Sequence, residues 1–86
     1  MRIDLFLKLM GVTKTRMGAK RLCDSGKVHA KATPLKPSQE ILTGDVLQVS
    51  LPQRVLRLQI LDIPSGKSVA KADRSRFVSV EILRED

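Results

Sequence analysis

Residues 13–28, TKTRMGAKRLCDSGKV, decide how this chain of 86 residues folds. Thr13 and Thr15 are candidate N-caps and Gly26 has the place of a helix stop, so the stretch predicts a helix over residues 15–25. Beyond Gly26 the apolar residues no longer follow a helical period. The apolar side of the predicted helix consists of Met17, Ala19, Leu22 and Cys23.

Another helix is predicted closer to the N-terminus. Its apolar residues are spaced i, i+3, i+4 and i+7, which places them on one helix face, and Gly11 follows as a stop. Asp4 lies in the first turn of this helix, where a negative charge suits the helix dipole. The residues of the apolar face are Ile3, Phe6, Leu7 and Met10.

After Gly26 the sequence predicts strands, because apolar and polar residues alternate. Pro34 and Pro37 bracket a loop or an edge segment. Residues 64–76 are long for a plain loop, so we expect them to have a function or to hold a short helix. The elements together predict an α+β fold, with two N-terminal helices packed on a small, mostly antiparallel sheet. The predicted strands cover residues 27–30, 47–51, 56–60 and 78–82.

The net positive charge is confined to the N-terminal part of the chain. Residues 1–36 contain nine Lys and Arg against two acids, whereas residues 37–86 contain seven of each. At this length we expect one domain, 1–86, made of a helical basic unit (1–36) and a β-rich neutral half (37–86). Charge concentrated in one structural unit is typical of a surface that binds phosphate groups.

The composition argues against several function classes. One His and one Cys cannot build a protein-only zinc site, no glycine-rich nucleotide loop is present, and so small a chain has little room for a catalytic pocket. We therefore expect no enzymatic activity, no cofactor and no metal. The single Cys23 is expected to be a small core residue. With two Phe and no Trp or Tyr, nucleic acid would be bound through phosphates and shape rather than through base stacking.

The sequence also predicts where the protein is found. Asp4 and Lys8 interrupt the stretch in which a signal peptide would have its apolar region. No apolar run approaches the ~18 residues that a membrane span needs. One cysteine excludes an internal disulfide and suits a reducing compartment. We expect a cytoplasmic protein that does not associate with a membrane.

The basic residues of the second helix form a candidate phosphate site. Arg16 and Lys20 are four residues apart and share one helix face, Lys14 precedes the helix, and Arg21 flanks the same side. The amides at a helix start are unpaired and carry partial positive charge, so a start flanked by Lys14 and Arg16 suits a phosphate. Thr15 could donate its hydroxyl to the same group. The alternative is a solvated cationic face with no partner.

Several short motifs resemble the S4 RNA-binding domain, the module named after a small-subunit ribosomal protein. Its pattern runs Arg-Leu-Asp-x-x-Leu, Ser/Thr-Arg-x-x-Ala, Gly-x-Val and a later Gly-Asp, and the match covers residues 2–49 in order. The chain is similar to the free-standing bacterial heat-shock and ribosome-quality-control S4 proteins (the ribosome quality control factor P family). The matching residues are Arg2-Ile3-Asp4, Phe6-Leu7, Thr13-Lys14-Thr15-Arg16, Ala19-Lys20, Ser25-Gly26-Lys27-Val28 and Gly44-Asp45-Val46-Leu47.

The resemblance implies a concave face for structured rRNA and tRNA, in the setting of a large ribosomal subunit that carries peptidyl-tRNA. It also implies a non-catalytic protein, which we expect to be a monomer. Arg16 is expected to be the main contact, because its planar guanidinium can bind a phosphate through two hydrogen bonds. For Arg2 the alternative is a surface ion pair with Asp4. The expected RNA-binding residues are Arg2, Lys14, Thr15, Arg16, Lys20, Arg21, Lys27 and Lys31.

One segment departs from the family pattern. The family usually has Asn-Gly as a tight turn after the first strand, and Lys31-Ala32 replaces that pair here. We expect either a looser hairpin or a tip that adds a cation in place of a backbone fit. His29 is expected to be an ordinary exposed strand residue, with an RNA contact as the alternative.

Two other functions remain open at this point. The chain could be an RNA-targeting accessory subunit for a separate RNA-modifying enzyme, which copurification with that enzyme rather than with ribosomal subunits would indicate. It could also be a small DNA-binding helical module, which a comparison of structured RNA with duplex DNA at equal salt would test. A second basic group is either an auxiliary RNA contact or a solvated loop; its members are Lys67, Lys71, Arg74 and Arg76.

Overall fold

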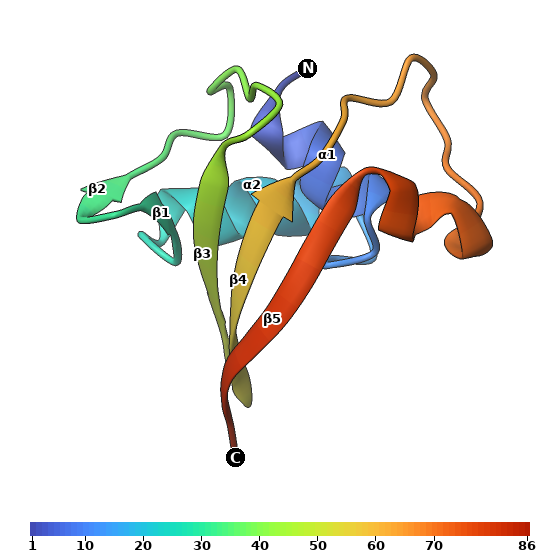
Figure 1. The fold of residues 1–86 in the computed structure, drawn as a ribbon. Helices are drawn as coiled ribbons and strands as arrows, with labels where there is room; N and C mark the ends of the chain where they lie inside the picture. The colour runs from blue at the N-terminus through green and yellow to red at the C-terminus, as the bar shows by residue number, and fades with distance from the viewer.

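The computed structural model describes all residues from 1 to 86. In chain order the elements are α1 (Ile3–Leu9), α2 (Arg16–Asp24), β1 (Val28–Ala30), β2 (Thr33–Pro34), β3 (Val46–Leu51), β4 (Arg54–Ile60), the 3-10 helix η1 (Lys71–Arg76) and β5 (Val78–Glu85). The two α-helices lie on one face of the sheet, and the β1–β2 hairpin and η1 lie on opposite sides of the molecule (Figure 1). Neither α-helix has the length and apolar character to cross a membrane.

The sheet has five strands in the order β2-β1-β3-β4-β5, and every neighbouring pair is antiparallel. The predicted α+β fold is therefore confirmed. The last strand is longer than the alternation predicted, because it continues past Ile82 to Glu85. A register shift between Val55 and Leu56 lets β5 follow β4 to its start, where Arg84 lies opposite Val55.

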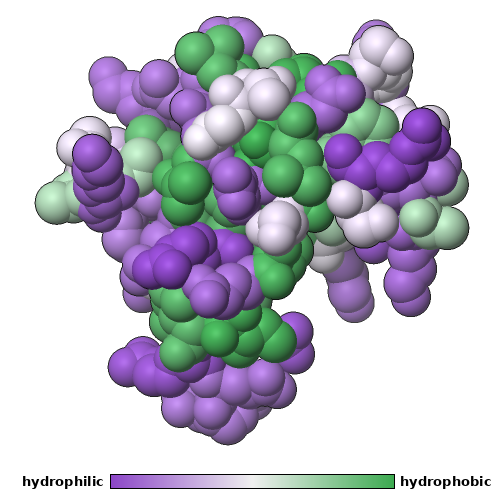
Figure 2. Space-filling model, in the orientation of Figure 1, coloured by the Kyte–Doolittle hydropathy of each residue, from purple (hydrophilic) through white to green (hydrophobic).

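One apolar cluster of 15 buried residues lies between the helices and the sheet. Leu47 and Val49 of β3 and Leu56 and Leu58 of β4 are buried, whereas the intervening Arg57 is exposed, so each strand buries one face. Figure 2 looks onto the sheet and shows apolar side chains that reach the surface among polar ones. The exposed large apolar residues on β3 and β5 are Val46, Val80, Ile82 and Leu83.

Helix α2 ends as the sequence predicts. Its N-cap is Thr15. At the other end the N–H of Gly26 donates to the carbonyl of Cys23, and the N–H of Lys27 donates to the carbonyl of Leu22. With φ of 72° at Gly26, this pair of bonds forms a Schellman motif. The helix expected from the capping residues is confirmed.

Fewer residues of α2 are buried than the sequence predicted. Ala19 and Cys23 are buried in the core, but Met17 is 57% exposed. The assignment of Met17 to the apolar side was wrong. Met17 lies two positions before Ala19, and two residues correspond to about 200° around a helix, so the two side chains point in nearly opposite directions.

The segment around residues 37–41 fixes the start of α1. The N–H of Ile3 donates to the carbonyl of Gln39 (2.8 Å), and the N–H of Asp4 donates to the carbonyl of Pro37 (3.2 Å). Backbone donors that are free at most helix starts are thus already paired in α1. Helix α1 ends before Gly11, whose φ of 75° suits only glycine well.

The β1–β2 hairpin and the segment 64–76, for which the sequence left alternatives open, both have defined structures. The β1–β2 hairpin keeps a two-residue turn, since Ala30 pairs with Thr33, so the expectation of a looser hairpin was wrong. Lys31 makes the turn by adopting a φ of 54°, which a non-glycine residue can do at some cost in strain. The segment 64–76 holds the short helix that its length suggested, η1.

Candidate nucleic-acid interface

The buried carboxylate of Asp4 holds two arginines side by side. Asp4 is 2% exposed. Its Oδ2 atom lies 3.1 Å from Nη2 of Arg2, and its Oδ1 atom lies 3.4 Å from Nε of Arg16. Oδ1 also accepts a hydrogen bond from the backbone N–H of Leu5 (2.8 Å). A buried carboxylate with these partners is well compensated, and it brings the guanidinium groups of two segments together.

Both arginines keep a free side toward solvent. The side chains of Arg2 and Arg16 are 45% and 48% exposed. Arg16 contacts Asp4 through Nε, which leaves its two terminal nitrogens for an external oxyanion. The ion pair of Arg2 with Asp4 is present as the alternative proposed, and an exposed guanidinium edge remains beside it. The RNA contacts of both residues stay predictions.

The start of α2 combines a cap with free donors. The Oγ1 atom of Thr15 accepts from the N–H of Gly18 (2.9 Å), and the hydroxyl of Thr13 donates to the carbonyl of Thr15 (2.8 Å). A Cβ atom at position 18 would lie 3.2 Å from Oγ1 of Thr15, so this glycine leaves room for the cap. The N–H groups of Arg16 and Met17 have no backbone partner, which makes the helix start attractive for an anion.

The other predicted cations differ in whether an acidic side chain lies within ion-pair distance. Lys20 lies 2.9 Å from the carboxylate of Asp24, one turn along α2, and this exposed ion pair partly offsets its charge. Lys20 lies on the helix as its spacing predicted, but its pairing with Asp24 was not predicted. The predicted cations that form no ion pair within 4 Å are Lys14, Arg21, Lys27 and Lys31.

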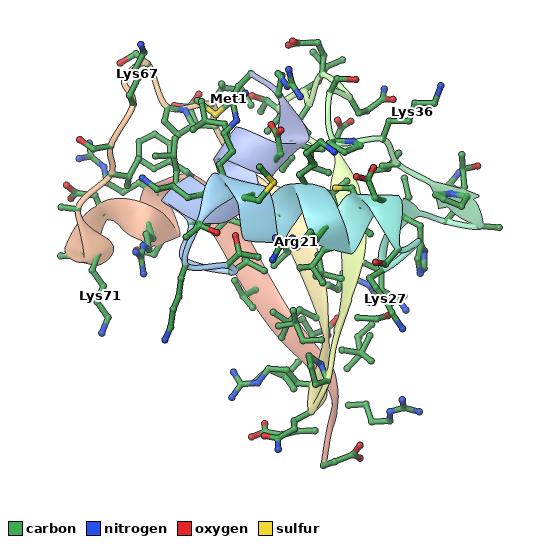
Figure 3. All side chains as sticks on the ribbon, turned by 180° about the vertical axis from the view of Figure 1, so that it is seen from behind. Met1, Arg21, Lys27, Lys36, Lys67 and Lys71 are labelled. Carbon is green, nitrogen blue, oxygen red and sulfur yellow. The ribbon has the colours of Figure 1, made fainter.

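A basic concavity lies beside the C-terminal half of α2. It has a volume of about 570 Å³, and it is lined by Arg21, Lys27 and Arg84 with no acidic residue. Figure 3 looks onto this side, where α2 crosses in front of the sheet and both Arg21 and Lys27 are seen. Ser25 and Ser50 add hydroxyl groups to its wall. The arrangement suits a polyanion that runs along α2.

Arg84 is the residue that the sequence argument missed. It belongs to residues 37–86, the half that was predicted to be neutral because seven cations and seven acids balance there. The pairing of Arg84 with Val55 carries it to the far end of the sheet, next to the end of α2. The only signal in the sequence was that β5 could extend beyond Ile82.

The second basic group is not a single patch. Lys67 and Lys71 project from the segment before β5, at the end of the molecule away from Lys27 (Figure 3). Arg76 is exposed, and its Nη1 atom lies 3.8 Å from Asp73. Arg74 instead turns inward, toward Gly11 at the end of α1.

The thiol of Cys23 plays no part in this interface. It belongs to the buried core, as predicted. Burial raises the pKa of Cys23 to about 11, with smaller contributions from the carboxylates of Asp4 and Asp24. The group is therefore a neutral thiol at physiological pH and a poor nucleophile.

The largest concavity lies elsewhere and has mixed charge. It has a volume of about 660 Å³, and its charged lining is Lys31, Glu40, Asp45 and Arg57. Arg57 also donates to Glu81 across the sheet at 2.8 Å. Because cations and carboxylates balance here, this site is less suited to a polyanion than the surfaces around α2.

Comparisons with known proteins find relatives that match most of the chain. A scan of protein-family models finds no match to the chain. The chain is 35% identical to the RQC P-site tRNA stabilizing factor of Helicobacter pylori (strain J99), over 92% of this chain and 94% of that protein. The solution structure of hypothetical protein HP1423 superposes with a TM-score of 0.80 at 31% identity, over 94% of this chain and 96% of the other.

A more distant structure shares the fold. It is a trimeric structure of Vibrio cholerae Heat Shock Protein 15, with a TM-score of 0.84 at 21% identity, over 94% of this chain and 81% of the other. The two structural likenesses confirm the predicted arrangement of helices and sheet.

Proposed function

The chain belongs to the family of RQC P-site tRNA stabilizing factors, and from this membership we propose that it binds tRNA in the ribosomal P site during ribosome quality control. It acts as a non-catalytic RNA-binding protein of the S4 type. Its partners are structured RNAs, the tRNA and the rRNA of the large subunit. We place the protein in the cytoplasm as a monomer.

One observation carries this proposal, the pair of guanidinium groups that Asp4 holds at the start of α2. Arg2 and Arg16 come from different segments, yet one buried carboxylate fixes both. Fixed guanidinium forks lose less side-chain entropy when they bind phosphate than free ones do. Lys14 and the unpaired N–H of Arg16 extend the same surface.

The basic surface is suited to recognition of RNA by its backbone and shape. Arginines and lysines bind phosphates without regard to sequence, and they position a protein on folded RNA. No Trp or Tyr is present to stack a base. The concavity of Arg21, Lys27 and Arg84 continues the surface along α2 toward the end of the sheet. A protein with these two adjoining surfaces can contact two RNA backbones at once, which bracing a tRNA against rRNA requires.

Sedimentation with ribosomal particles tests the proposal. The purified protein is mixed with large subunits that carry peptidyl-tRNA or with vacant large subunits, and the pelleted fraction is measured. We expect stronger retention on the tRNA-carrying particles. The variant Arg2→Ala/Arg16→Ala should lose that preference, and the control Arg57→Ala should keep it, since Arg57 lies on the mixed-charge side.

Two results would contradict the proposal. Equal retention on both particles, with no effect of the double substitution, would show that P-site tRNA is not the partner. Recovery of the protein with an RNA-modifying enzyme rather than with ribosomal subunits would favour the accessory-subunit alternative.

A further inference from the structure

A small polar pocket lies between the end of α1 and the segment that leads to η1. Its volume is about 330 Å³, and three cations line it without any acidic residue. Lys8 comes from the last turn of α1, Lys14 from the loop before α2, and Arg74 from η1. The pocket therefore joins the N-terminal helices to a segment close to the C-terminus. Its remaining polar side chains are Thr13 and Ser68.

The Arg74 guanidinium fills the place of a missing side chain. A Cβ atom on Gly11 would lie 2.6 Å from Cζ of Arg74 and 3.0 Å from Nη2. The guanidinium thus packs directly against the backbone at the end of α1. Position 11 requires glycine for two reasons. Its φ of 75° suits glycine, and a Cβ atom there would collide with the guanidinium of Arg74. Such close packing holds Arg74 in one orientation.

This held guanidinium has an unmet hydrogen bond. The Nε atom of Arg74 is buried and has no acceptor, and it is the only buried side-chain nitrogen or oxygen of the protein in that condition. No carboxylate lies within 4 Å of Arg74, a feature that it shares with Arg21, Arg54 and Arg84, but among these four arginines only Arg74 has a buried nitrogen without an acceptor. A buried donor of a charged group without an acceptor is costly, so its retention calls for an explanation.

Because Nε of Arg74 is closed to solvent, a ligand in the pocket would contact the terminal nitrogens of this guanidinium, which have no acceptor either, and the pocket lining indicates what kind of ligand that is. Its polar groups include two ammonium groups, one guanidinium and the hydroxyl of Ser68, all of which can donate hydrogen bonds to an oxyanion, whereas the hydroxyl of Thr13 already donates to the carbonyl of Thr15. No aromatic side chain lines it, so it offers no surface on which to stack a base. The site therefore matches a phosphate group rather than a whole nucleotide.

We propose that the pocket of Lys8, Lys14 and Arg74 binds a backbone phosphate of RNA, as a contact separate from the Arg2–Arg16 pair. This inference rests on the proposed function, since RNA is the polyanion that supplies the phosphate. Lys14 borders both the pocket and the start of α2, so one RNA strand can pass from one to the other. The segment 64–76 would then contribute to RNA binding, because it supplies Ser68 and Arg74 to the pocket.

Salt-dependent binding of tRNA to the intact protein tests the inference. Affinity is measured by fluorescence anisotropy over a range of KCl concentrations for Lys8→Gln, Arg74→Gln, Arg16→Gln and the control Lys71→Gln. Lys71 is exposed on the same segment and lies outside the pocket. We expect Lys8→Gln and Arg74→Gln each to lower the salt slope by about one unit, as loss of one phosphate contact does, and Lys71→Gln to leave it unchanged.

A direct titration provides a second readout. Inorganic phosphate should shift the amide signals of Gly11, Thr13 and Ser68 in wild type and not in Lys8→Gln. Lys8 is only half-buried, and its side chain is not among the atoms nearest to a Cβ on Gly11, so this variant keeps the test valid if Arg74→Gln does not fold.

The outcomes separate the two ideas. If Arg16→Gln lowers the slope but Lys8→Gln and Arg74→Gln do not, the pocket inference is wrong and the proposed function stands. If wild type binds phosphate in the pocket but does not bind tRNA, the proposed function fails, and the assignment of the pocket to RNA fails with it. If an acidic peptide, rather than tRNA, competes with phosphate for the pocket, a protein partner replaces RNA there.

Discussion

The carboxylate of Asp4 lies 3.4 Å from Nε of Arg16, so the first turn of one helix determines how the first residue of the next is presented. Asp4 is almost fully buried, whereas Arg16 is half-exposed. In the proposed function the acid therefore acts on RNA indirectly, by orienting Arg2 and Arg16. An acidic residue inside the basic unit supports binding in this account instead of opposing it.

The substitution Asp4→Asn tests this relationship. It removes a negative charge near the site, so charge alone would predict tighter binding of tRNA. We expect weaker binding, by about threefold to tenfold, because both guanidinium groups lose their anchor. Stability should fall by about 1–3 kcal/mol, because an ion pair with a buried member is broken. Anisotropy titrations and urea unfolding measure the two effects, and an increase in affinity would contradict the positioning role.

Arg84 provides a test of the concavity along α2. The substitution Arg84→Gln should lower the salt slope of tRNA binding by about one unit, although the residue lies in the neutral half of the sequence. The matched control is Arg54→Gln, because Arg54 is exposed on the neighbouring strand and lines none of the concavities described above. This control should leave the slope unchanged. Equal slopes for wild type and Arg84→Gln would remove Arg84 from the interface.

Because the backbone of Lys31 is strained, we expect a substitution of this residue by glycine to raise the stability of the protein. Lys31 has a φ of 54°, so Lys31→Gly should relieve strain and raise stability by about 0.5–1 kcal/mol. The matched control is Ala32→Gly, at the turn position without a positive φ, which should lower stability. Thermal unfolding measures both, and a shift of about 2–8 °C is expected at this size. A loss of stability in Lys31→Gly equal to that in Ala32→Gly would contradict the strain.

The thiol of Cys23 predicts a loss of stability at high pH. Burial raises the pKa of Cys23 from 9.0 to about 11 in the folded protein. The unfolded chain therefore loses this proton first as the pH rises, and a contribution that is complete below pH 9.0 disappears by about pH 11. Urea unfolding over this range should show a decline for wild type that exceeds the decline for Cys23→Ala by on the order of 1–2 kcal/mol. Parallel pH profiles would show that this thiol does not titrate differently on folding.

Local signals in the sequence predicted most of the fold. Thr15 and Gly26 marked the ends of α2 correctly, because a cap and a left-handed stop depend on neighbouring residues only. The alternation around Leu47 and Leu58 predicted strands for the same reason. Met17 was misplaced because a one-dimensional count of apolar residues did not follow the helix angle.

The parts that could not be predicted depend on long-range register. Arg84 reaches the end of α2 only through the bulge beside Leu56, and no local pattern fixes that bulge. Arg74 meets Gly11 because η1 returns to the end of α1, a contact between residues far apart in the sequence. The two-residue turn at Lys31 forms because pairing of Ala30 with Thr33 outweighs the strain of a positive φ.

In the proposed function the start of α2, with Arg16 fixed by Asp4, binds phosphates of folded RNA. The decisive measurement is the salt dependence of tRNA binding by Arg16→Ala, compared with that of Arg57→Ala. We predict that the slope for Arg16→Ala falls by about one unit and that the slope for Arg57→Ala equals that of wild type. An unchanged slope for Arg16→Ala, with a reduced slope for Arg57→Ala, would place the RNA on the opposite side of the sheet and contradict the account.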